Sequence, residues 1–205
     1  MLFRSDNALQ FYRKALDVDP SAYEPCYNYA RALHQKALLS EAISFYSKAC
    51  ELNKCYAEPF WNKSLCYLLS GDYESGWSLY GYRLRLSSGH PLHAKPSLPL
   101  WKGGSSVKAE DEPVLLVSEQ GFGDTLQGCR YLPLLAAKGA RVIVEVPATL
   151  RRLMVAAPFS AQVRVVVSGD PLPSFDFHCP MMSLPLAFGT TLASIPAQVP
   201  YLVAP

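Results

Sequence analysis

The sequence predicts a two-part fold of the α + α/β class, in which an α-solenoid precedes an open, mostly parallel α/β sheet. Three observations predict it: a 34-residue repeat, strand-helix-strand patterning after residue 112, and an uneven distribution of proline. Of the 17 prolines, 3 precede residue 86 and 14 follow residue 90. Proline is excluded from helix interiors, because its ring removes a donor and clashes with the preceding turn. We therefore expect a helical part at 1–86, a linker at 87–112 and an α/β part at 113–205.

The repeat in the first part involves both helices of each unit. Small residues recur where two helices of a hairpin must approach closely, and aromatic residues recur where the next hairpin stacks. Pro25 and Pro59 fall in the first turn of a helix, where proline is tolerated. A shift of 34 residues aligns Ala8, Tyr12, Ala15, Tyr27, Asn28, Ala30 and Leu33 with Ala42, Tyr46, Ala49, Trp61, Asn62, Ser64 and Tyr67.

This pattern resembles the tetratricopeptide repeat, a helix-turn-helix unit of the same period, over residues 6–86. Gly76 again occupies a small-residue position, but Arg83 stands where a small alanine is expected, so we expect this last helix to end the array. Residues 6–17 are predicted to be the second helix of a hairpin. We therefore expect the chain to begin inside a longer array.

The resemblance implies a concave groove lined by the first helix of each hairpin. Asparagines one repeat apart can hold the backbone of an extended peptide, since a carboxamide offers both a donor and an acceptor. Similar asparagine ladders line the repeat domain of O-linked N-acetylglucosamine transferases. The alternative is that the asparagines only satisfy local polarity and that Trp61 belongs to the core. The expected ligand is a protein or peptide, and the residues expected to line the groove are Tyr27, Asn28, Arg31, Trp61, Asn62 and Leu65.

The second part begins with an apolar run at 113–118, followed by Gly121-Phe122-Gly123-Asp124 and a helical stretch through Lys138. Gly139 is predicted to end that helix, and further strands are predicted at 141–146, 162–167 and 175–178. Apolar strands separated by a helix indicate parallel pairing. Ligands of such sheets gather at the carboxyl ends of the strands, so we expect Glu119–Thr125 and His178-Cys179-Pro180 to meet there.

The glycine-rich turn has the composition of a ligand-binding loop. Glycines permit tight turning and close approach of a ligand to the main chain, and a following helix directs free N–H groups at the ligand. The alternative is that Asp124 is only a helix N-cap. Leu126 rules out a dinucleotide fingerprint, and a Walker loop would need a lysine followed by serine or threonine.

Four segments resemble a bacterial family that joins tetratricopeptide repeats to a glycosyltransferase domain, itself similar to the ADP-heptose:lipopolysaccharide heptosyltransferases. The resemblance implies a two-lobed, metal-independent glycosyltransferase of the GT-B type. Acceptor contacts would lie in the first lobe, and the sugar nucleotide would be held mainly by the second. The four segments are Ser118–Gln127, Arg130–Pro133, His178–Pro185 and Gly71–Tyr73 with Gly76-Trp77.

The sequence ends at Pro205, about where the first lobe should finish, so we expect a chain truncated after that lobe and catalytically incomplete by itself. A sugar nucleotide is expected to bind only if the second lobe is present. The competing hypothesis is a non-catalytic interaction scaffold in which the α/β part caps the solenoid.

The chemistry implied by the resemblance needs a base that removes a proton from an acceptor hydroxyl. Asp124 matches the candidate base, and His178 is the alternative, because imidazole titrates near neutral pH. His178 can equally be a satisfied loop histidine. Arg130 can meet a phosphate or carboxylate or remain a surface arginine. The glycine-rich site is expected to comprise Gly121, Gly123, Thr125, Gln127 and Arg130.

Composition excludes several other classes of function. The net charge is only +2 and the basic residues do not cluster, which argues against a nucleic-acid partner. The first residues lack a signal peptide, and no apolar run approaches the roughly 20 residues of a transmembrane helix. We expect a cytoplasmic protein without metal or cofactor, whose six scattered cysteines are reduced and mostly buried thiols.

Overall fold

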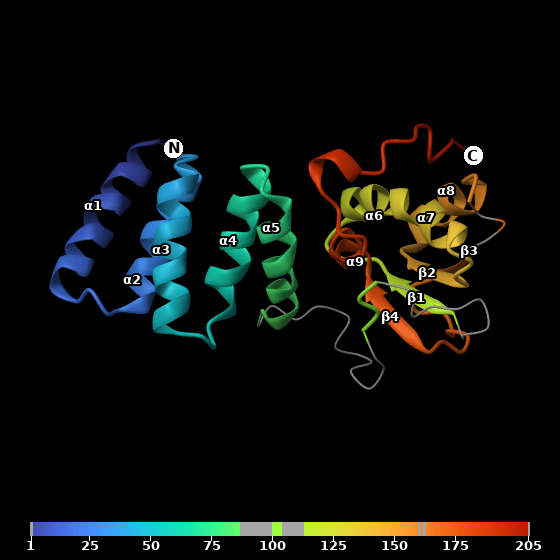
Figure 1. The fold of residues 1–205 in the computed structure, drawn as a ribbon, viewed down its shortest axis with the longest axis horizontal. Coiled ribbons are helices and arrows are strands. Elements are labelled where there is room, and N and C mark those ends of the chain that lie inside the picture. Colours follow the sequence, from blue (N-terminus) through green and yellow to red (C-terminus); the bar gives the residue numbers. More distant parts are fainter. Residues whose placement is uncertain (1, 87–99, 104–112, 160, 162, 205) are drawn as a thin grey trace. The chain divides into compact units, whose positions relative to one another are not determined.

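The computed structural model describes residues 2–86, 100–103, 113–159, 161 and 163–204. The chain divides into two compact units, 1–89 and 90–205 (Figure 1). Most of the predicted linker, 87–99 and 104–112, lies outside the described residues. Within the described residues, none of the helices combines the length and apolar character that a bilayer-spanning segment requires.

The first unit is a row of helices in which each packs against the next (Figure 1). Its helices pair as hairpins, as the 34-residue period predicts, and Pro25 and Pro59 are the third residues of their helices. The bounds are α1 Leu2–Val18, α2 Tyr23–Gln35, α3 Leu39–Leu52, α4 Ala57–Leu69 and α5 Tyr73–Tyr80, followed by the 3-10 helix η1 Gly81–Arg85.

The repeated small residues lie where two helices come into close contact, as predicted. Ala30, Ala42 and Ser64 are completely buried. A Cβ atom on Gly76 would lie 2.5 Å from Cδ2 of Leu68, so only glycine fits without a shift at this contact between α4 and α5. The repeated small residues therefore set how closely the two helices of each hairpin approach.

The regular pattern of small residues ends at Arg83, a large side chain at a position where the repeat has alanine. Its buried guanidinium lies 4.6 Å from the centre of the Tyr80 ring, and Nη1 donates a hydrogen bond of 3.2 Å to the Tyr80 carbonyl oxygen. α5 stops after eight residues and continues as η1.

Replacing Tyr46 with phenylalanine is expected to stabilise the first unit by about 1 kcal/mol, because it removes a buried, unpaired hydroxyl. Tyr46 is completely buried, and its hydroxyl has no hydrogen-bond partner among the described residues. Burial also raises the pKa of Tyr46, so the hydroxyl remains neutral. Urea unfolding followed by circular dichroism measures the change. Tyr67→Phe, at a partly exposed ring, should leave the midpoint unchanged; a lower midpoint for Tyr46→Phe would contradict the prediction.

The second unit contains the predicted open parallel sheet, with strand order β3-β2-β1-β4. Gly139 ends the helical stretch after β1 with a φ of +75°, as the sequence predicts. The bounds are β1 Val114–Val117, α6 Phe122–Gly128, η3 Cys129–Tyr131, α7 Leu132–Ala137, β2 Val142–Val146, η4 Ala148–Leu150, α8 Arg151–Ala156, β3 Val163–Val167, β4 Phe177–Pro180, η5 Met181–Ser183, α9 Leu184–Ala187 and η6 Leu192–Ser194.

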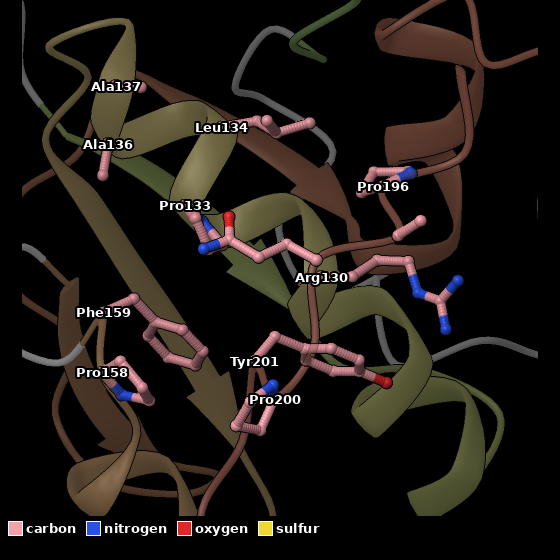
Figure 2. A pocket seen from close by; sticks show the side chains of 12 residues that line it. Arg130, Pro133, Leu134, Ala136, Ala137, Pro158, Phe159, Pro196, Pro200 and Tyr201 are labelled. Carbon is pink, nitrogen blue, oxygen red and sulfur yellow. The ribbon is translucent and has the colours of Figure 1, made fainter. Parts of the chain in front are cut away.

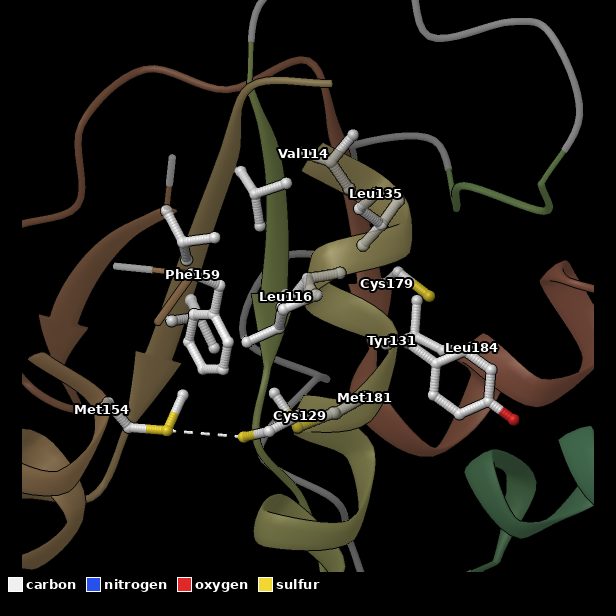
Figure 3. Packing of buried hydrophobic residues seen from close by; sticks show 14 of the residues in the cluster. Val114, Leu116, Cys129, Tyr131, Leu135, Met154, Phe159, Cys179, Met181 and Leu184 are labelled. Atoms are coloured by element: carbon white, nitrogen blue, oxygen red, sulfur yellow. Dashed lines mark hydrogen bonds between the residues drawn. The ribbon is translucent and has the colours of Figure 1, made fainter. Parts of the chain in front are cut away.

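The two faces of the sheet are covered differently. Val114 and Leu116 of β1 face a core shared with α6 to α9, in which Cys129 donates its thiol hydrogen to Sδ of Met154 at 3.4 Å (Figure 3). Leu115 faces the opposite side, with Ile143 and Val166. The alternating directions of successive β1 side chains explain why the whole strand is apolar.

The fourth strand begins two residues later than predicted. β4 spans Phe177–Pro180, and the register pairs His178 with Leu115 and Pro180 with Val117. The prediction treated Cys179-Pro180 as a turn, but proline is tolerated where a strand ends and no further ladder hydrogen bond is needed. His178-Cys179-Pro180 therefore lies within β4, and the turn after the strand is η5.

Residues 100–103 belong to the α/β unit rather than to a free linker. The Trp101 amide donates a hydrogen bond of 2.9 Å to the His178 carbonyl, beside an isolated parallel bridge between Leu100 and His178. Only 3% of the Trp101 side chain is exposed, and its ring meets Phe188 edge-on at 5.9 Å. Burial of a large indole is favourable, which explains why this segment packs on the sheet.

Candidate functional site

The residues predicted to line a groove lie on α2 and α4 of the helical unit. Nδ2 of Asn62 donates to the hydroxyl of Tyr27 at 3.2 Å and to the carbonyl oxygen of Glu58 at 2.9 Å. The first bond joins side chains from two successive repeats. The bond therefore links one predicted residue of α2 to one predicted residue of α4.

Tyr27 supports the predicted groove surface as a buried residue, because its ring is covered and only its hydroxyl bonds to Asn62. Its side chain is 8% exposed and its ring meets those of Tyr46 and Tyr56 at 6.0 and 5.1 Å. Burial raises the pKa of Tyr27, so its neutral hydroxyl can accept the hydrogen bond from Asn62. The amide hydrogens of Asn62 thus bond to groups within the helical unit, which is the structural alternative for this asparagine. Its Oδ1 remains available.

The other predicted groove residues are more accessible. Arg31 is exposed, with its guanidinium carbon 5.6 Å from the centre of the Tyr27 ring. Asn28 is partly exposed and makes no side-chain hydrogen bond within the described residues. Trp61 and Leu65 are also partly exposed, although Nε1 of Trp61 is buried without a hydrogen-bond partner among those residues.

The glycine-rich turn in the α/β unit has a different backbone from the one predicted. Gly121 is extended, with φ −153° and ψ −179°, and α6 already begins at Phe122. The left-handed residue is Gln120, with φ +66°, which is uncommon for a residue with a side chain. Thr125 is buried and directs both its amide and its hydroxyl to the Gly121 carbonyl, at 3.1 and 3.0 Å. It therefore stabilises the turn.

The space next to Gly121 and Gly123 is open, which agrees with the prediction that these glycines let a ligand approach the main chain closely. A Cβ atom on Gly121 would meet only Oδ2 of Asp124, at 3.5 Å, and one on Gly123 would meet nothing within 4 Å. A ligand can therefore approach this main chain closely.

Asp124 is not an N-cap, and that alternative is wrong. Gly121 occupies the cap position of α6 without a side-chain cap hydrogen bond, and Asp124 is the third residue of the helix. Its partly exposed carboxylate lies near Gly121 and makes no hydrogen bond to another described residue. The carboxylate is consequently available to a ligand at this edge.

His178 does not lie at the strand end where it was predicted, and Arg130 has contacts with Gln127 and Tyr201. His178 lies level with Leu115, two residues before β4 ends, and shares the sheet face of Leu115. Nε of Arg130 donates to the Gln127 carbonyl at 3.1 Å, and its guanidinium lies 5.4 Å from the centre of the Tyr201 ring (Figure 2). Gln127 is exposed.

Glu119 is a residue at this site to which the sequence analysis assigned no role. It is only 4% exposed, and its Oε1 accepts a hydrogen bond of 2.9 Å from the Met182 amide. The bond joins the loop after β1 to the turn after β4. These two neighbouring strands flank the topological switch point, where the strand order of the sheet reverses. In open α/β sheets this switch point is the usual ligand crevice. The only signal in the sequence is an acidic residue directly after an apolar strand.

No metal site is evident in the described part of the chain, since no three histidine, cysteine, aspartate or glutamate side chains gather there. The described residues at the sheet edge offer the carboxylate of Asp124 and an open glycine main chain.

The tetratricopeptide repeat family matches residues 23–54, which include α2 and α3. The first unit thus contains a tetratricopeptide repeat, a module that binds partner proteins, and a parallel α/β unit follows it. No curated protein matches the sequence.

Several solved structures are similar to the chain. Two crystal structures of MamA are each 20% identical, cover 41% of this chain and 49% and 46% of their own, and have TM-scores of 0.38 and 0.39. A mutant of the Thermobaculum terrenum O-GlcNAc transferase is 12% identical over 77% of this chain and 37% of its own, with a TM-score of 0.38. The chain spans about half or less of each of these structures.

Proposed function

We propose that the helical unit binds an extended segment of a partner protein along α2 and α4. The observation that carries this proposal is the hydrogen bond from Asn62 to Tyr27, which links equivalent surfaces of successive repeats. Below the surface, aromatic rings hold these side chains in place. Above it, Asn28, Arg31, Leu65 and Oδ1 of Asn62 offer the polar and apolar contacts that a peptide needs.

The two asparagines would recognise the peptide backbone in different ways. Asn28 has both its donor and its acceptor available, so it can bind a peptide carbonyl and a peptide N–H together. Asn62 uses its donors internally and offers only an acceptor, which suits a peptide N–H. Arg31, held over Tyr27, presents guanidinium donors to a carboxylate or a carbonyl of the partner.

Peptide-array binding should weaken when Asn28 is changed to alanine. We expect a loss of affinity of about fivefold, since a neutral hydrogen bond contributes about 1 kcal/mol. Asn62→Ala should have at least the same effect, because it also removes the bond that fixes Tyr27. Asn7→Ala, at an exposed position of α1, is the control and should leave binding unchanged. Unchanged binding in both groove variants would contradict the proposal.

For the α/β unit we propose a second function, the acceptor-binding lobe of a GT-B glycosyltransferase similar to the heptosyltransferases. The observation that favours it is the available carboxylate of Asp124 beside the open glycine backbone at the carboxyl end of β1. Asp124 would take the proton of an acceptor hydroxyl as the sugar leaves its nucleotide. His178 lies within β4 and is not assigned this role.

In this proposal the sugar nucleotide is held mainly by a second α/β lobe. Calorimetric titration of this chain with ADP-sugars and UDP-sugars should therefore show no binding, and tight binding would contradict the assignment of the donor site. When a second lobe is supplied, Asp124→Asn should lower kcat at least about 100-fold, as expected for loss of a general base. Unchanged turnover would instead favour the non-catalytic scaffold.

The thiols support a reducing compartment such as the cytoplasm for both functions. All six cysteines are free, and five of them are buried.

A further inference from the structure

A pocket of about 470 Å³ lies in the α/β unit beside α7 (Figure 2). Its walls come from α7, from the segment before β3 and from residues 196–201 near the end of the chain. We refer to it as the proline pocket, since its apolar walls are formed largely by Pro133, Pro158, Pro196, Pro200, Phe159 and Tyr201.

These walls favour a pocket that is already shaped before a ligand enters. Proline rings restrict the backbone and have no side-chain freedom to lose on binding. Phe159 is almost completely buried and belongs to the hydrophobic core of the unit, so the floor of the pocket is anchored. A volume of this size falls within the roughly 300–1,000 Å³ typical of small-molecule sites.

Arg130 is the cationic group of the pocket. Its Nε donates to the Gln127 carbonyl and its guanidinium lies against the Tyr201 ring, which together hold the side chain in place. Its two terminal nitrogens make no hydrogen bond or ion pair with any described residue. None of the described residues that line the pocket is acidic. An apolar pocket with one oriented, uncompensated guanidinium is complementary to an apolar molecule that carries one negative group.

We propose that the proline pocket binds a small aromatic carboxylic acid. Its ring lies against the apolar wall beside Tyr201, the side on which Figure 2 shows Arg130, and its carboxylate accepts two parallel hydrogen bonds from the terminal nitrogens of Arg130. A guanidinium matches the two oxygens of a carboxylate in this geometry. A phosphate dianion fits less well, because the pocket supplies a single cation for it. Neither Asp124 nor the residues of the proposed peptide surface are among those that line the pocket.

The test uses the full chain and two ligands of similar shape, 2-naphthoate and the neutral 2-naphthalenemethanol, titrated by calorimetry and by backbone NMR. We expect naphthoate to bind and to shift the amide signals of residues 130–137 and 196–201. Arg130→Gln should weaken naphthoate about tenfold, as loss of a charged hydrogen bond predicts, and should change binding of the neutral alcohol less than about twofold.

Two further variants separate binding from folding. Ala137→Trp should fill the pocket and weaken both ligands, while Arg164→Gln removes an exposed arginine from β3 and should leave both affinities unchanged. The proposal is overturned if naphthoate shows no binding at concentrations up to about 5 mM, since a formed site should have a Kd well below that concentration. It is also overturned if Arg130→Gln and Arg164→Gln have equal effects, or if the shifted signals lie outside the pocket.

Discussion

Gly103→Ala is expected to destabilise the α/β unit by about 3 kcal/mol, through backbone strain together with a steric clash. Gly103 has a φ of +87°, which residues with side chains rarely adopt. A Cβ atom there would lie 1.9 Å from the Ala187 carbonyl oxygen and 2.7 Å from its carbon. Because these are backbone atoms at the end of α9, a side-chain rotation cannot relieve the clash.

The loss should appear as a melting temperature lower by roughly 10 °C or more, since 1 kcal/mol shifts a small domain by several degrees. Gly189→Ala is the matched control, because Gly189 also has a positive φ, +58°, but open space around the added Cβ. It should cost only about 1 kcal/mol, the strain alone. Equal losses for the two variants would show that the contact between Gly103 and α9 is not tight. A tight contact also explains how residues 100–103 hold Trp101 in the core.

Glu119→Ala is expected to destabilise the α/β unit by about 2–3 kcal/mol, because it leaves the buried Met182 amide without its acceptor and creates a cavity. Oε1 of Glu119 accepts the hydrogen bond from that amide, across the switch point of the sheet. Amide exchange measures the effect directly. The Met182 N–H should exchange at least about tenfold faster, which corresponds to a local loss of about 1.4 kcal/mol.

Glu119→Gln separates the hydrogen bond from the charge. The amide side chain retains an oxygen acceptor of nearly the same shape, so this variant should lose less than about 1 kcal/mol. Unaltered exchange at Met182 in Glu119→Ala would contradict the role given to the bond. If the bond does tie the two loops together, its loss should also weaken acceptor binding near Asp124 in the proposed glycosyltransferase lobe.

The repeated helices and the parallel sheet could be predicted because their signals are local and redundant. Ala30, Ala42 and Gly76 recur at a fixed period, and each must be small for the same reason of helix contact. β1 and β2 are apolar along their whole length because both sheet faces are covered. Errors of one or two residues at an element's end do not disturb such patterns.

The candidate sites depended on contacts between residues that lie far apart in the sequence, which no local sequence pattern contains. Glu119 meets Met182, which is 63 residues away, and Tyr27 is buried because Tyr46 and Tyr56 pack against it from other helices. The two-residue displacement of β4 removed His178 from the edge at which Asp124 lies, since register in a sheet is set by the partner strand. Arg130 likewise lies over Tyr201 because the chain returns to α7 some seventy residues later.

Fold class and a set of candidate residues for peptide and ligand contacts thus follow from sequence, because helix period, strand hydrophobicity and turn composition act over a few residues. Which of those side chains are buried, which meet one another and which stay available was decided by tertiary packing. The reason is that direction and burial depend on neighbours supplied by distant segments, and a displacement of two residues is enough to move a side chain along the sheet.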